Sequence, residues 1–105
     1  METSDLPHHW PEPETRDLLE TIVRLRSVEE AEGFFLDLCT RSELEAMAHR
    51  WEVAKLLDSG LTYVEVADRA HASTATVTRV AQWLRHGAGG YRLALDRRQR
   101  RARTA

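Results

Sequence analysis

The residues best suited to chemistry lie between Thr74 and Arg85, where short polar and basic side chains recur with helical spacing. Apolar residues in this segment follow an i, i+3, i+4, i+7 pattern, which turns the residues between them outward. Arginine can bond both acceptors of guanine, glutamine can pair with adenine, and threonine methyl groups can contact thymine. Because no acid lies between Arg69 and Arg85, this face suits the major groove of DNA. Its residues are Thr74, Ala75, Thr78, Arg79, Gln82 and Arg85.

Two helices must position this face, and both begin at recognisable capping residues. Thr62 and Glu65 have the spacing of a capping box, which predicts a helix of about two turns through Ala70. Ser73 is placed to cap the second helix, which we expect to run to about Arg85. Backbone N–H groups at both helix starts could bind phosphate oxygens. The predicted phosphate contacts are therefore the helix starts at Thr62 and Ser73 and the side chains of Tyr63 and Arg69.

Only His71 and Ala72 separate these helices, which is too short a connection for an ordinary antiparallel hairpin. A helix-turn-helix motif explains the tight corner, and Ala67 is a small residue where the helices would cross. Glycine is most usual at the corner, but histidine adopts positive φ more readily than most residues, so we expect modest strain at His71. The inner faces are expected to contain Val66, Ala70, Ala72, Val77 and Val80.

The other segments also have helical patterns, and none has the alternation typical of a strand. We expect an amphipathic helix beyond Pro13, with apolar positions over residues 18–25, and a second helix after the capping residue Ser27. A third helix has its apolar positions over residues 44–57 and should stop at Gly60. A last helix should begin near Tyr91, after a glycine-rich break. The predicted fold class is all-α, with a flexible segment over 1–13, a helical dimerisation and DNA-binding domain over 14–96, and a frayed basic tail over 97–105.

Composition supports a single globular domain, because 105 residues with 42% hydrophobic and 30% charged side chains can form one core. No apolar run approaches the roughly 20 residues of a membrane span, and the N-terminus lacks a secretory signal pattern, so we expect a cytoplasmic protein. Charge is divided along the chain. Residues 1–48 have 12 acids and 4 bases, whereas residues 49–105 have 5 acids and 11 bases. A surface for a polyanion is therefore expected in the second half.

Residues 43–50 (ELEAMAHR), 61–63 (LTY) and 72–80 (ASTATVTRV) resemble the Trp repressor superfamily, especially its small repressor-like branch. The resemblance covers roughly residues 15–95. It implies an intertwined homodimer of helical protomers whose reading heads align on successive major grooves. The function implied is sequence-specific binding of double-stranded DNA by a bacterial transcriptional regulator of repressor type.

The same resemblance argues against tryptophan as an effector. In the tryptophan-binding members the indole lies between two arginines, of which Arg79 matches one and His49 replaces the other. A glycine and a serine of those members correspond to Val80 and Trp83 here, and these larger side chains would occupy the space of an indole. No cofactor is implied, and whether another effector exists is open.

Two alternatives use the same residues differently. One is a sigma-factor-like, polymerase-associated module that binds promoters, and the other is a helical protein-interaction module without DNA binding. An enzyme is not expected, because the chain has neither a phosphate-binding glycine loop nor a nucleophile motif. His8 and His9 lack further ligands at a regular spacing, so no metal site is predicted. Cys39 is expected to be a buried small hydrophobe and Trp51 a core residue.

Overall fold

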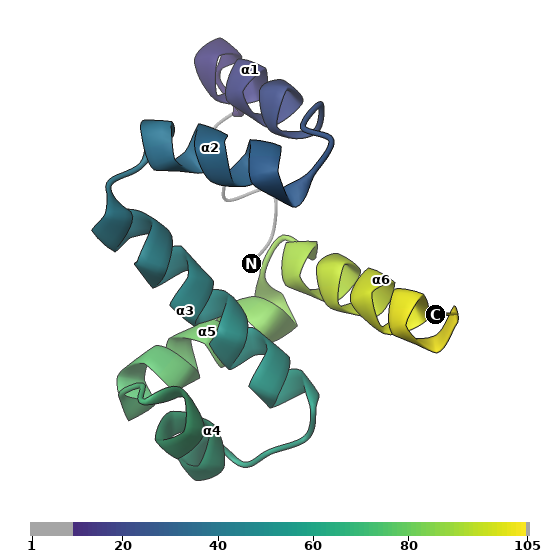
Figure 1. Ribbon diagram of the computed structural model, residues 1–105. Helices are drawn as coiled ribbons and strands as arrows, with labels where there is room; N and C mark the ends of the chain where they lie inside the picture. Colours follow the sequence, from purple (N-terminus) through teal and green to yellow (C-terminus); the bar gives the residue numbers. More distant parts are fainter. Residues whose placement is uncertain (1–9, 105) are drawn as a thin grey trace. The chain divides into compact units, whose positions relative to one another are not determined.

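The computed structural model of the protein describes residues 10–104, and within this range every regular element is an α-helix (Figure 1). The predicted all-α class is therefore confirmed. His8, His9 and most of the predicted flexible segment lie outside the described residues. The helices are α1 Pro13–Ile22, α2 Val28–Leu38, α3 Arg41–Asp58, α4 Tyr63–Ala70, α5 Thr74–His86 and α6 Gly90–Thr104.

The chain forms two compact units, which divide inside α3 between Ala46 and Met47. The described part of the first unit contains α1, α2 and the start of α3. Ser27 caps α2 by accepting from the Glu30 amide at 3.0 Å, and Thr40 accepts from the Glu43 amide at 3.1 Å. The cap at Ser27 is the one that the sequence predicted.

Neither α1 nor α2 contains a buried residue in the single chain. Several of their large apolar side chains are exposed, and Val28 reaches 79% exposure, whereas Leu18, Ile22, Phe34 and Phe35 are partly buried. Cys39, expected to be buried, is only partly so. Helix α1 ends at Ile22, so the predicted continuation to Leu25 is wrong.

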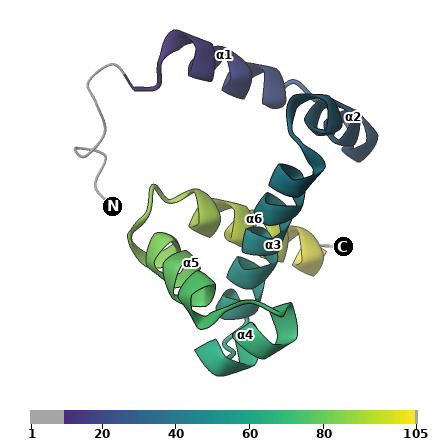
Figure 2. The same ribbon diagram turned by 90° about the vertical axis from the view of Figure 1, so that its left-hand side faces the viewer.

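The second unit, described over residues 47–104, contains the rest of α3 together with α4, α5 and α6 (Figure 2). Each of these helices contributes buried residues to its core. Short side chains allow the helices to pack closely. Val66, Val77 and Val80 are buried as predicted, whereas Ala70 and Ala72 are partly buried against the same core. The buried residues are Val53 and Ala54 from α3, Val66 from α4, Val77, Val80 and Ala81 from α5, and Leu95 from α6.

Helix α6 extends much further than the sequence analysis expected. The residues predicted as a frayed tail are helical to Thr104, so the predicted boundary after residue 96 falls inside a helix. Asp58 binds this helix twice, accepting from Arg92 at 2.8 Å and from the Gln99 amide at 2.6 Å. The Trp51 and Tyr91 rings also stack, with centroids 6.3 Å apart. Arginine, glutamine and alanine favour helices, and no breaker follows Gly90 until the chain ends.

Among residues 10–104, no helix combines the length and apolar character needed to cross a membrane.

Candidate nucleic-acid interface

The corner between α4 and α5 is a Schellman motif centred on His71. His71 has φ 54° and ψ 43°, the left-handed conformation that the sequence analysis expected at this residue. The Ala72 amide donates to the Ala67 carbonyl at 2.9 Å, and the His71 amide donates to the Asp68 carbonyl at 3.3 Å. This pair of hydrogen bonds is typical of a helix that is terminated by a single residue in the left-handed conformation. The short turn and the two helices that flank it, α4 and α5, form the predicted helix-turn-helix.

The two helix starts differ, although the sequence analysis treated them alike. At α4 the Thr62 hydroxyl accepts from the Glu65 amide, while the Thr62 amide donates to the Glu65 carboxylate at 2.8 Å. Hydrogen bonds from Thr62 hold the pKa of Glu65 below its usual value, so a negative charge occupies this end. At α5 the Ser73 hydroxyl accepts from the Thr76 amide at 3.1 Å, and the first turn contains no acid. The start of α5 is therefore the better place for a phosphate.

The outward face of α5 has the composition and exposure that its sequence predicts. Val77, Val80 and Ala81 are buried on the opposite side of the helix. The polar face of α5 is exposed to solvent. The side chains of Arg79 and Gln82 are therefore available to the bases of a bound DNA. The residues predicted for this face are all exposed, namely Thr74, Ala75, Thr78, Arg79, Gln82 and Arg85, and the predicted phosphate contacts Thr62, Arg69 and Ser73 are exposed as well. Trp83, which is 44% exposed, and His86 are the other exposed residues of α5.

Tyr63 is the one predicted contact that is partly buried. It packs against the core of the second unit, and the Arg85 guanidinium lies over its ring at 5.9 Å from the centroid. The structure therefore brings together two predicted DNA contacts from opposite ends of the motif. This cation–π contact restricts where the Arg85 side chain can reach.

Sequence reasoning did not identify the role of His49. Its Nε2 atom lies 2.8 Å from the carbonyl oxygen of Ala70, at the end of α4. A signal was present, because His49 precedes the apolar Val53 by one helical turn and thus shares its face of α3.

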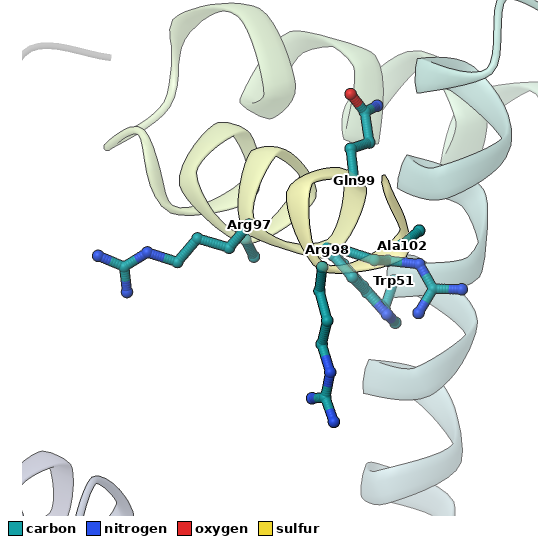
Figure 3. Close-up of a pocket in the computed structure, with 7 residues that line it drawn as sticks. Trp51, Arg97, Arg98, Gln99 and Ala102 are labelled. Atoms are coloured by element: carbon teal, nitrogen blue, oxygen red, sulfur yellow. The ribbon is translucent and has the colours of Figure 1, made fainter. Parts of the chain in front are cut away.

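A basic hollow of about 730 Å³ lies beside α6, with Trp51 of α3 in its wall (Figure 3). Arg97 and Arg98 extend from α6 into open space in this view. The residues that line the hollow are Trp51, Ala94, Arg97, Arg98, Gln99, Arg101 and Ala102.

A chain whose regular elements over residues 10–104 are all helices, with a tight helix-turn-helix and an acid-free outer face on the second helix of that motif, defines a helix-turn-helix protein of the DNA-binding class. The family model described as Trp repressor protein matches residues 14–99. The chain therefore belongs to the Trp repressor family, whose members are regulatory DNA-binding proteins rather than enzymes.

Individual relatives agree with this assignment. The uncharacterized protein YerC of Bacillus subtilis is 43% identical over 84 residues, which are 80% of this chain and 81% of YerC. A solved TrpR-like protein from Eubacterium eligens is 39% identical, with a TM-score of 0.74 over 78% of this chain and 84% of its own. A proposed Trp repressor from Staphylococcus aureus is 34% identical, with a TM-score of 0.80 over 94% and 95% of the two chains. These similarities confirm the resemblance to the small repressor-like branch.

Proposed function

We propose that this protein is a homodimeric transcriptional regulator of repressor type that binds specific sequences in double-stranded DNA. The observation that carries the proposal is the outward face of α5, which is exposed, polar and basic, and begins at a helix end without an acid in its first turn. A helix placed in the major groove with its N-terminal residues against base edges is the usual arrangement of this motif.

The predicted contacts have distinct roles in this arrangement. Thr74, Ala75, Thr78, Arg79 and Gln82 would face the bases, because they lie on the exposed side of α5. Thr62, Tyr63, Arg69 and Ser73 would contact the phosphates. Arg85, which the sequence placed on the base-reading face, lies over the Tyr63 ring, so we expect it to contact phosphates as well. The Glu65 carboxylate weakens the attraction of the α4 start for phosphate, so we expect the α5 start to set the register.

A homodimer accounts for the exposed apolar side chains of the first unit. Leu19, Val23, Val28, Leu36 and Leu38 are each about half exposed or more, and they lie on α1, α2 or immediately after α1. Apolar side chains at this density mark an interface between proteins. A second copy would cover them and would supply the second reading head for a two-fold DNA site.

The contacts of His49 and Val80 support regulation without tryptophan. His49 already bonds the Ala70 carbonyl, and the Val80 side chain, only 1% exposed, fills part of the core. His49 does not take the role of the arginine that contacts the indole in the tryptophan-binding members, and Val80 does not leave the space that their glycine leaves.

Selection of bound sequences from a random pool of double-stranded DNA tests the proposal. We expect a consensus of two half-sites related by two-fold symmetry. A variant carrying both Arg79→Ala and Gln82→Ala is the matched control, because these side chains are exposed and their loss should abolish enrichment while the fold remains. A pool that shows no enrichment with the wild-type protein would contradict the proposal.

A further inference from the structure

The side chain of His49 reaches from α3 to the corner of the helix-turn-helix. Its Nε2 atom lies 2.8 Å from the carbonyl oxygen of Ala70, in a partly buried contact between residues 21 positions apart. A carbonyl oxygen can only accept, so Nε2 carries the proton and donates. This bond connects the core helix α3 to the last residue of α4.

The bond completes the hydrogen bonding at the end of α4. The last four carbonyls of a helix have no partner within the helix. Here the His71 and Ala72 amides donate to Asp68 and Ala67, whereas the donor for Ala70 comes from His49. Without this imidazole the Ala70 carbonyl would remain partly buried and would lose its hydrogen-bond donor. A buried acceptor without a donor lowers the stability of the folded state.

The two ends of this connection have different surroundings. Val53, one turn after His49, is fully buried, as is Ala54 beside it, so α3 provides a firm support. At the other end, two residues separate Ala70 from Ser73, which caps α5. A shift of the Ala70 carbonyl would therefore be transmitted directly to the first turn of α5.

We infer that His49 is a positioning residue that holds the start of α5 in its DNA-reading orientation without a small-molecule effector. The inference rests on the proposed function for the reading role of α5. His49 acts through the Ala70 carbonyl and the corner that follows, and it does not itself contact DNA. It makes the reading head rigid by a bond within the protomer.

Hydrogen exchange of the full chain without DNA tests the positioning directly. His49→Phe keeps a ring but removes the donor, whereas His49→Gln places an amide nitrogen near the position of Nε2. We expect the Ala72 and Thr76 amides to exchange about three- to tenfold faster in His49→Phe and to return to the wild-type rate in His49→Gln. His86→Gln, at the exposed end of α5, is the control and should match the wild type. Unchanged exchange in His49→Phe would overturn the inference.

DNA affinity tests the consequence for reading. His49→Phe should weaken binding to the selected sequence about three- to tenfold, change binding to random DNA much less, and be rescued by His49→Gln. An equal loss on both DNAs, or no rescue, would show that His49 does not orient α5. If the wild-type protein selects no sequence, the proposed function fails, and the exchange experiment still decides whether His49 holds the corner.

Should His49→Phe not fold, the wild-type imidazole provides a second measurement. Nitrogen NMR of the full chain should show His49 with a protonated, slowly exchanging Nε2. A neutral imidazole protonated on Nδ1 alone would exclude the bond and overturn the inference.

Discussion

The guanidinium of Arg85, in the last turn of α5, lies 5.9 Å from the centroid of the Tyr63 ring, the first residue of α4. The ring thus has two separable roles, as a platform for Arg85 and as the carrier of a hydroxyl that could meet phosphate. Its partly buried position makes the platform role structural.

Tyr63→Phe should separate these roles. It retains the ring, so we expect an unchanged unfolding midpoint and a loss of about 0.5 to 1.5 kcal/mol in DNA binding, equal for all sequences. Tyr63→Ala, as the comparison, also removes packing and the cation–π contact and should lower the unfolding midpoint. Thermal unfolding and titration of the two variants with DNA check this. Wild-type affinity in Tyr63→Phe would rule out the hydroxyl as a phosphate contact.

Arg79→Ala should lose base reading, because Arg79 is exposed on the face of α5 opposite the core. We expect a cost of about 1 to 3 kcal/mol per half-site and a relaxed preference at one base position. Binding of a library with single base changes measures both effects.

Arg97 and Arg98 of α6 provide the contrast, because they lie outside the helix-turn-helix and we expect them to meet only phosphates. Replacing both with glutamine should weaken all DNA sequences alike and flatten the dependence of affinity on salt. Glutamine preserves helix propensity, which matters because these residues are helical. If this variant and Arg79→Ala lose specific and random binding in the same ratio, Arg79 does not read bases.

The protein should sediment at twice the chain mass of 12.1 kDa. The physical reason is that α1 and α2 expose large apolar side chains; Val28, for example, is 79% exposed in the single chain. Val28→Glu should therefore shift the equilibrium toward monomer, whereas Glu29→Gln beside it should not. A two-fold dimer predicts half-sites about 34 Å apart in the selected DNA. A wild-type monomer at micromolar concentration would contradict both expectations.

L-tryptophan should neither bind nor tighten DNA binding. His49 cannot supply a permanently charged planar fork, and Val80 lies within the core. Calorimetric titration with L-tryptophan, alongside DNA-binding assays with and without it, measures both properties. Micromolar binding that strengthens DNA affinity would disprove this expectation.

The capping box of α4 predicts a pH dependence in the acid range. Hydrogen bonds from Thr62 lower the pKa of Glu65 in the folded state below its usual value of about 4.5. The stability contributed by this carboxylate is therefore present above about pH 4.5 and is lost as the pH falls through the lower folded-state pKa. Glu65→Gln should be less stable than the wild type at pH 6, and the difference should shrink toward pH 3. Denaturant unfolding at several pH values checks this, and Thr62→Ser, which keeps the cap, should follow the wild type.

The sequence by itself determined the helices and the helix-turn-helix, because helix caps and helical spacing depend on residues that are close together in the chain. The caps at Ser27, Thr62 and Ser73, and the positive φ of His71, depend on residues only a few positions apart. The outward face of α5 follows from the helical repeat of its apolar residues. The sequence therefore predicted the class of protein and the exposure of most candidate contacts. It placed the end of α1 too late in the chain and underestimated the length of α6.

Contacts between distant residues were decided only by the tertiary structure. The bond from His49 to the Ala70 carbonyl depends on the crossing of α3 and α4, which no local pattern specifies. The helical conformation of residues 97–104 accompanies the binding of Arg92 and Gln99 to Asp58, 34 and 41 positions earlier in the chain. The contact of Arg85 with Tyr63 likewise needs the ends of two helices to meet. Local spacing determines which side chains face solvent, whereas packing between helices determines which of them reach one another.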